Sequence, residues 1–423
     1  MHAGSIMWGH TLTRFQARAA RHMSSSQQQS LSQSGKRFHG KADSAFESSV
    51  WTLGAISLIL PVGIVLVYDP VPAERNAKKK KAAMFGDEYP SSLSTTGLAV
   101  GSDSQCPLPS GRAYLLKSGD RQVCVTQFGS DSGRPVLLFH GLAASRIESA
   151  ATMSIADPLQ SGEAPDLHQL CTQQGLRLLC IDRPGYGLTS PASSAADAPS
   201  TSAADAVHVL DALRLPSAQL VAVDMGAVPA VLMAEQHSAR VHGEIHLLAP
   251  DFCRAVAPSD GLARGLRDWL LQTAPISTPF MHFFAKFLRL TTLAMPANSL
   301  KNAQMQNVTA DSSDAGMMGR MGGGLMLSCA QASMDRGATG VQHDLTVQLG
   351  KHATALAALR QLPSPVHLWQ GMQDQVVPSA VPEAMLALLP NSTVHPLEGA
   401  GHLSAVASGL MSSLGLGEEA AER

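Results

Sequence analysis

Three residues that can do chemistry stand directly after apolar runs of the sequence: Asp224, Asp374 and His402. Such runs are typical of buried strands, and they cover residues 220–223, 366–369 and 393–397. In a parallel sheet the residues after the strands gather at one edge, which is where such proteins bind ligands. Two carboxylates and an imidazole brought together there suit nucleophilic catalysis, in which His is the base and one acid orients it.

The stretch around Asp224 is the most informative of the three. A strand-like run ends at Asp224, and small residues then open a helix in which Pro229 is tolerated because it lies in the first turn. Ala222 and Gly226, two positions before and after Asp224, leave room for a tight strand-to-helix turn that displays its side chain. We therefore predict that the Asp224 carboxylate is presented as a nucleophile.

Eight short apolar runs separated by turn residues predict the strands that position these groups. They cover residues 113–116, 123–128, 136–139, 176–181, 220–223, 245–248, 366–369 and 393–397. Helical patterns lie between several of them, including residues 203–213 and 225–237. Strands that alternate with helices favour a mostly parallel sheet with helices on both faces, so the predicted fold class is α/β.

The alternation stops over residues 250–349, which hold two helical patterns and a run rich in Met and Gly. We interpret this stretch as a helical cap inserted into a core formed by residues 111–249 and 350–423. Flexible Met side chains suit a lid over an apolar small-molecule substrate, although a poorly ordered surface loop has a similar composition.

The chain before the core predicts a targeting segment. Residues 1–49 are assigned to it, because residues 1–42 contain no Asp or Glu but several Arg and Lys among Ser and Gln. This composition is typical of mitochondrial transit peptides, and a disordered tail is the alternative.

An apolar run and a linker follow the targeting segment. Residues 50–68 are uncharged, and their number is close to the roughly 20 that a helix needs to cross a bilayer. We predict a single membrane span there, with a buried soluble helix as the alternative. Residues 69–110, rich in Pro, Ser, Gly and Lys, are predicted to be a linker. The expected protein is thus a single-pass membrane protein of mitochondria, with an orientation that the flanking charges do not decide.

Composition bears on partners and cofactors. The formal net charge is −2 and only 15% of residues are charged, so nothing indicates a nucleic-acid partner. The six cysteines show no CxxC or paired metal spacing, so no metal site is predicted. We expect no cofactor.

The chain from about residue 111 onward resembles the α/β-hydrolase fold superfamily. The resemblance rests on the order nucleophile, acid, His and on the turn at Asp224. It also rests on four segments: FHGLA at 139–143, DRPGYG at 182–187, PVHLWQG at 365–371 and GAGH at 399–402. It implies a hydrolase in which Asp374 orients His402 and the backbone N–H groups of Leu142 and Met225 form an oxyanion hole.

Asp224 stands where this family usually carries Ser, which resembles haloalkane dehalogenases and epoxide hydrolases. In those branches a carboxylate attacks an sp3 carbon, and a His-activated water hydrolyses the resulting alkyl ester. The match is incomplete, because Met225 replaces their usual Trp and no Tyr lies in the predicted cap to act as the acid. A catalytically inactive scaffold or binding protein is therefore the alternative function.

Four further residues carry open assignments. Trp269 and Arg146 are candidates for substrate contacts, although Trp269 would also serve packing and Arg146 could be solvated. Asp251, after the sixth predicted strand, is an alternative to Asp374 as the orienting acid, because some members of the family place the acid there. We interpret His140 as shaping its turn rather than transferring protons.

Overall fold

The computed structural model describes residues 111–156, 166–251, 285–286, 289, 292, 313–314, 317, 324–334, 337–348, 358, 360–374, 376–377 and 391–416. The predicted targeting segment, membrane span and linker, residues 1–110, lie outside the described residues, as does Trp269. Within the described part of the chain, no helix combines the length and the apolar character needed to cross a membrane.

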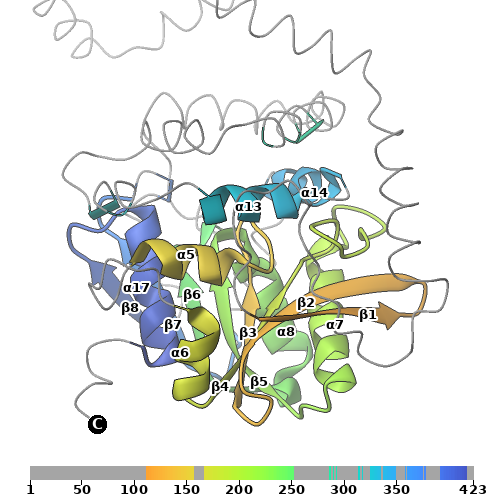
Figure 1. The fold of residues 1–423 in the computed structure, drawn as a ribbon, viewed down its shortest axis with the longest axis horizontal. Coiled ribbons are helices and arrows are strands. Elements are labelled where there is room, and N and C mark those ends of the chain that lie inside the picture. Colours follow the sequence, from red (N-terminus) through yellow and green to blue (C-terminus); the bar gives the residue numbers. More distant parts are fainter. Residues whose placement is uncertain are drawn as a thin grey trace, which may run out of the picture. The chain divides into compact units, whose positions relative to one another are not determined.

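The described strands form one eight-stranded sheet (Figure 1). They are β1 (Arg112–Ser118), β2 (Arg121–Gly129), β3 (Arg134–Phe139), β4 (Leu176–Ile181), β5 (Ala218–Val223), β6 (Val241–Leu248), β7 (Val366–Gly371) and β8 (Ser392–Leu397). Their order across the sheet is β1-β2-β4-β3-β5-β6-β7-β8. Only the β1–β2 and β2–β4 pairs among these neighbours are antiparallel. The predicted mostly parallel sheet is confirmed.

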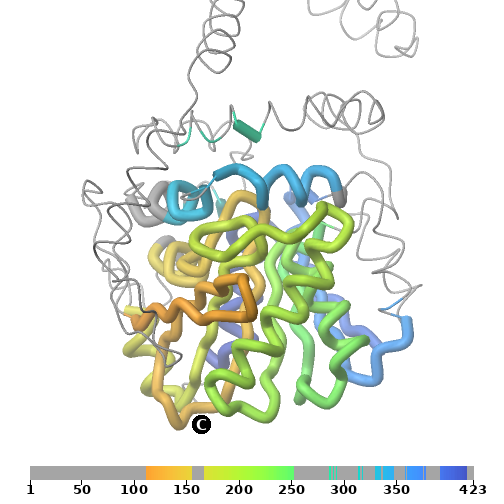
Figure 2. The backbone as a smooth tube through the Cα atoms, turned by 90° about the vertical axis from the view of Figure 1, so that its right-hand side faces the viewer, coloured from red at the N-terminus to blue at the C-terminus, as the bar shows by residue number. Residues whose placement is uncertain are grey.

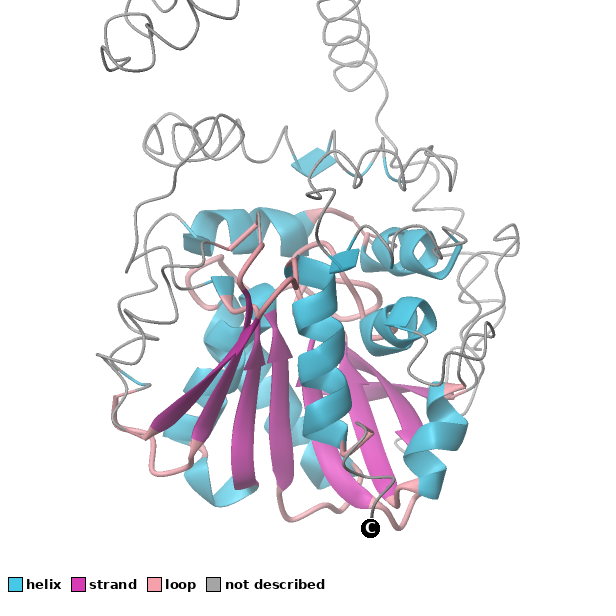
Figure 3. Ribbon diagram, turned by 90° about the vertical axis from the view of Figure 1, so that its left-hand side faces the viewer, coloured by secondary structure: helices cyan, strands magenta, loops and turns pink. Residues whose placement is uncertain are grey.

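Helices pack on both faces of this sheet, as predicted. The described helices are α5 (Glu148–Ala156), α6 (Leu167–Gln173), α7 (Ala198–Ala212), α8 (Ala227–Gln236), α13 (Gly324–Ser333), α14 (Thr339–Gln348) and α17 (His402–Leu414), with 3-10 turns η1 (Asp224–Gly226) and η2 (Ser238–Arg240). In β3, Leu137 and Phe139 belong to the core formed with α7 and α8. Val136 and Leu138 belong to the core formed with α5, α6 and α17. Figure 3 shows α17 lying against one face of the sheet.

Helices α13 and α14 come from the insertion, residues 250–349, between β6 and β7. Figures 1 and 2 show them lying across one end of the sheet. A buried group anchors α14: Arg183 donates to both carboxylate oxygens of Asp344 at 2.7 and 2.6 Å, and the Tyr186 hydroxyl donates to Oδ2 at 2.6 Å. Breaking such a buried pair costs about 3–5 kcal/mol, so Asp344 ties the insertion firmly to the core.

Candidate active site

Asp224 lies at the turn between β5 and α8. It has a φ of 47°, in the left-handed region that L-residues rarely adopt. This conformation costs on the order of 1–3 kcal/mol, although Asp tolerates it better than most residues. Gly226 allows the turn to close, because a Cβ at that position would collide with the carbonyl oxygen of Phe139. The strained turn places the Asp224 side chain at the carboxyl end of a central strand.

The turn after β3 presents two successive backbone N–H groups to carboxylates. Leu142 N–H donates to Oδ2 of Asp224 at 2.9 Å, and Gly141 N–H donates to Oε2 of Glu148 at 2.9 Å. The N–H predicted for an oxyanion hole therefore lies against the Asp224 carboxylate itself. Met225, the other predicted donor, follows Asp224 in η1 and is buried.

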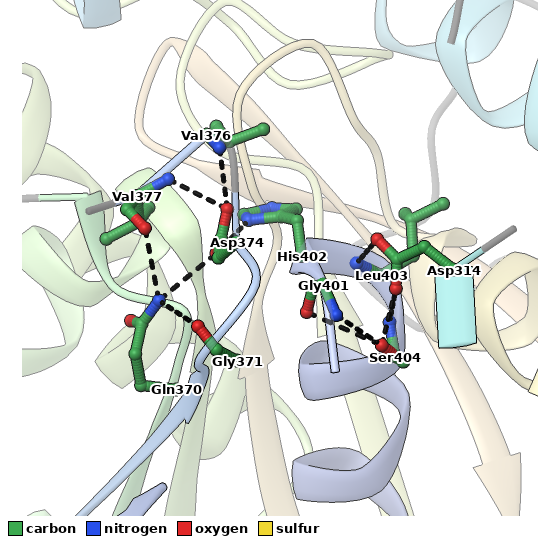
Figure 4. Close-up of polar contacts among 10 residues, drawn as sticks. All are labelled: Asp314, Gln370, Gly371, Asp374, Val376, Val377, Gly401, His402, Leu403 and Ser404. Atoms are coloured by element: carbon green, nitrogen blue, oxygen red, sulfur yellow. Dashed lines mark hydrogen bonds and ion pairs between the residues drawn. The ribbon is translucent and has the colours of Figure 1, made fainter. Parts of the chain in front are cut away.

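His402, half-buried at the start of α17, pairs with Asp374, buried on the loop after β7 (Figure 4). His402 Nδ1 lies 2.9 Å from Oδ2 of Asp374. The other oxygen of Asp374 accepts the backbone N–H groups of Val376 at 2.6 Å and Val377 at 2.9 Å. These donors fix the carboxylate, so Asp374 in turn fixes the orientation of the imidazole ring.

Electrostatics connect this pair to Asp224. Burial disfavours the charged imidazole, but the carboxylates of Asp374, Asp224 and Asp314 outweigh burial and raise the pKa of His402 to about 9. Burial would raise the pKa of Asp374, but the charge and hydrogen bond of His402 lower it. At pH 7 His402 is therefore protonated. Asp224, Asp374 and His402, which lie far apart in sequence, belong to one charged cluster.

Most of the sheet, the turn at Asp224 and the Asp374–His402 pair lie in a segment that matches a family model in sequence. A family model described as alpha/beta hydrolase fold matches residues 134–406, which is more than half of the chain. The chain belongs to the α/β-hydrolase fold family. The matched segment includes the turn at Asp224 and the loops that carry Asp374 and His402.

Solved structures resemble this α/β-hydrolase at low identity. A 2-hydroxy-6-oxo-6-phenylhexa-2,4-dienoate hydrolase from Rhodococcus sp. strain RHA1 is 15% identical, with 72% of this chain and 96% of that chain covered and a TM-score of 0.48. An esterase from Exiguobacterium antarcticum is 17% identical, with coverages of 71% and 98% and a TM-score of 0.47. These similarities carry no argument about function. No curated protein matches the chain in sequence.

Glu148 is a residue of the site that the sequence analysis did not single out. It is the first residue of α5, and a Cβ placed on Gly141 would lie 3.2 Å from Oε1 of Glu148 and 3.2 Å from Cβ of Asp224. Desolvation, together with the nearby Asp224 charge, raises the pKa of Glu148 to about 7, against the hydrogen bond from Gly141 N–H. A second carboxyl that holds a proton near neutral pH thus lies beside Asp224. The sequence offers one hint of this role: Glu148 is the only acidic residue between Asp131 and Asp157.

Glu148→Gln should make the protein more stable at pH 8 and leave it nearly unchanged at pH 5. The pKa of Glu148 is raised above its ordinary value of 4.5, so its contribution to stability is complete below that value and is lost as pH rises through about 7. Gln cannot ionise, so the variant should gain about 2 kcal/mol over wild type at pH 8. Urea unfolding at both pH values measures this. The exposed Glu235→Gln is the matched control, and an equal gain at both pH values would contradict the prediction.

His140 shapes its turn, in agreement with the interpretation from sequence. Its Nε2 accepts the backbone N–H of Arg183 at 3.0 Å, so its Nδ1 carries the hydrogen and donates to the Gly141 carbonyl at 2.8 Å. Burial, reinforced by the charge of Arg183, holds the pKa of His140 well below its usual range. A neutral ring with both nitrogens engaged fixes the backbone that presents Gly141 and Leu142.

Arg146 is not solvated, so that alternative is wrong. Its guanidinium donates to Oδ2 of Asp182 at 2.8 Å, and its side chain is 4% exposed. The backbone N–H of Arg146 also donates to Asp182 at 2.8 Å. A guanidinium held in a buried ion pair is a structural group, and this geometry offers no support for a contact with an acidic substrate.

The alternative orienting acid, Asp251, is buried just after β6. The hydrogen bond of His402 Nδ1 goes to Asp374 instead. The geometry therefore favours Asp374 in this role.

Proposed function

We propose that this α/β-hydrolase hydrolyses an apolar small molecule by using Asp224 as its nucleophile, through an alkyl-enzyme ester. The observation that carries the proposal is the hydrogen bond from Leu142 N–H to Oδ2 of Asp224. It orients the carboxylate at a strained turn beside the His402–Asp374 pair. A carboxylate held in one orientation can attack a carbon that it would not attack in water.

The first half of the reaction forms the ester. We assign the attack on an sp3 carbon to Oδ1 of Asp224, which keeps Oδ2 on Leu142 N–H. The bond from that carbon to a halide or an epoxide oxygen breaks. A halide leaves with the electron pair and needs no proton. An epoxide oxygen becomes an alkoxide, and the protonated His402 is placed to supply its proton.

The second half hydrolyses the ester. Esterified Asp224 has lost its negative charge, which is one of the charges that raise the pKa of His402. The pKa of His402 then falls. In the epoxide route the ring has already given its proton to the alkoxide, and in the halide route it releases its proton to solvent. The neutral ring can then take a proton from the attacking water. The hydroxide attacks Cγ, and negative charge develops on Oδ2, where Leu142 N–H already lies at hydrogen-bond distance. Collapse breaks the bond between Cγ and the former Oδ1, and the protonated His402 gives its proton to that oxygen, so that the alcohol leaves with it.

The residues around the site suggest the substrate class. Tyr186, Met334 and Val341 form a buried cluster against which Leu142 of the oxyanion turn packs. Apolar side chains of the insertion thus reach the turn that holds Asp224. This supports an apolar substrate, as does the Met-rich composition of the insertion.

One observation favours the alternative, a catalytically inactive scaffold or binding protein. In a serine hydrolase the oxyanion N–H must be open to substrate, whereas here Leu142 N–H is engaged by Asp224. The carboxylates and the protonated His402 could then serve only to hold the loops together.

A single turnover in heavy-oxygen water separates the two functions. Wild-type protein in excess over lipophilic epoxides or haloalkanes should gain one heavy oxygen in the peptide that contains Asp224, because water attacks Cγ of the ester. Peptide mass spectrometry measures the gain. Conversion of a compound without label in that peptide would exclude Asp224 as the nucleophile. No conversion of any compound would favour the scaffold.

We also propose that residues 50–68 anchor the protein in a mitochondrial membrane, after import directed by residues 1–49. The support is the sequence alone: an acid-free basic segment followed by an uncharged apolar run. A fluorescent reporter fused to residues 1–110 should fractionate with mitochondrial membranes. A reporter with Arg14, Arg18 and Arg21 replaced by Glu should lose import, and a cytosolic signal from the unmodified fusion would contradict the proposal.

A further inference from the structure

Helix α17 starts with His402, and the residue that precedes the helix has no side chain to cap its first turn. The residue before it, Gly401, occupies the N-cap position and has no side chain to accept hydrogen bonds. The first backbone N–H groups of a helix have no partner within the helix, and the N-cap side chain usually accepts those of the second and third residues. Here these are the N–H groups of Leu403 and Ser404.

Asp314, from the insertion, fills this role (Figure 4). Its Oδ2 accepts Leu403 N–H at 3.0 Å, and its Oδ1 accepts Ser404 N–H at 2.8 Å. The contact spans about 90 residues of sequence. Gly401 is required for it, because a Cβ there would collide with the Asp314 carboxylate.

Further contacts hold Asp314 against this loop. The Ser404 hydroxyl donates to Asp314 and accepts Gly401 N–H at 2.9 Å. The neighbouring Ser313 donates to the Gly399 carbonyl from its backbone N–H at 2.9 Å and from its hydroxyl at 3.1 Å. Asp314 is 3% exposed, and its charge is favourable at the positive end of the helix. The segment 313–314 is therefore docked on the loop that carries His402.

We propose that Asp314 is a positioning residue for His402: from the insertion it caps the helix that begins with His402 and so fixes the backbone from which the imidazole reaches Asp374. The role of His402 as a base rests on the proposed function, whereas its placement by Asp314 does not. Asp374 fixes the imidazole ring by a hydrogen bond, and Asp314 fixes the backbone at the start of α17.

The charge of Asp314 also acts on the imidazole. The ionisable groups that interact with His402 are Asp374, Asp224, Asp314 and Glu148. The charge of Asp314 is among those that raise the pKa of His402. If Asp314 only stabilised the helix, replacing it with a neutral N-cap residue would leave the pKa of His402 unchanged.

The test compares Asp314→Asn and Asp314→Ala in the 423-residue chain. Asn caps helices about as well as Asp but carries no charge. Asp166→Asn and Asp166→Ala are the controls, because Asp166 also caps a helix, α6, through a single oxygen that accepts His168 N–H and Gln169 N–H. Histidine NMR, with the His402 signal assigned from a His402→Gln variant, gives the pKa of His402 and the signal of its Nδ1 proton. Thermal unfolding reports stability.

We expect both Asp314 variants to lower the pKa of His402, and Asp314→Ala also to weaken the Nδ1 proton signal and lower the melting temperature. Asp314→Asn keeps one of the two acceptor oxygens, so it should melt between wild type and Asp314→Ala, and titration well below its melting temperature separates its effect on His402 from unfolding. Asp166 variants should leave His402 unchanged. An unaltered His402 pKa and Nδ1 signal in both Asp314 variants would overturn the inference. A lowered pKa in a protein that turns over no compound would support the inference and count against the proposed function.

Discussion

Replacing His402 with Gln should leave ester formation intact and block ester hydrolysis, so that an alkyl adduct accumulates on Asp224. The carboxylate needs no base to attack, because it is itself the nucleophile and Leu142 N–H orients it. Water does need a base to attack the ester, and general-base catalysis is worth about 10²–10⁴-fold. Haloalkanes are the sharper probes, since a halide leaves without the proton that His402 would give to an epoxide. Digestion and peptide mass spectrometry locate the adduct.

The matched control for this trap is the double variant Asp224→Asn with His402→Gln, which should form no adduct. Glu148→Gln with His402→Gln should still form the adduct on Asp224, because the trap requires only that carboxylate. An adduct on Glu148 in place of Asp224 would mean that the wrong carboxyl has been assigned. If haloalkanes that wild type converts leave no adduct in His402→Gln, the ester mechanism is wrong.

Replacing Asp224 with Ser should turn a protein that ignores fluorophosphonates into one that is labelled by them. Two consequences of the substitution act together. Leu142 N–H loses its carboxylate partner and can bind the phosphonyl oxygen, and one oxyanion donor is worth about 10²–10³-fold. His402 loses a charge that raises its pKa, so more of it is neutral at pH 7 and able to accept the Ser proton.

The labelling requires both His402 and Ser at position 224. The double variant Asp224→Ser with His402→Gln should remain unlabelled, and so should Asp224→Ala. In-gel fluorescence with a fluorophosphonate probe, together with circular dichroism to verify folding, gives the readout. A folded Asp224→Ser variant that resists labelling would mean that His402 or the turn at Leu142 is not competent for catalysis, which favours the scaffold.

The sheet could be predicted from the sequence because its signal is local. Each central strand is a short apolar run, such as β4, whose residues are all buried. The extra residues of β6, Val241 to Glu244, were missed because they are exposed or half-buried and mostly polar. Helix α5 was also missed, since its small residues give almost no apolar stripe.

The three residues proposed for chemistry could be singled out because each follows a strand, and strand order determines where they meet. Glu148 and Asp314 could not be found in this way. The significance of Glu148 depends on a hydrogen bond to Gly141 and on the nearness of Asp224, and that of Asp314 depends on a helix start about 90 residues away. Such tertiary contacts leave no periodic pattern in the sequence.

The ion pair between Arg183 and Asp344 limits how this protein can be re-engineered. Arg183 also donates to the carbonyls of His140 and Gly141, so one guanidinium contacts both the turn after β3 and helix α14. A lid grafted from a relative to change substrate preference must bring its own acid to the position of Asp344. Without that acid, Arg183 would be a buried, unpaired cation beneath the new lid. The turn at Gly141, which Arg183 also holds, would then lose its shape before the fit of the lid was affected.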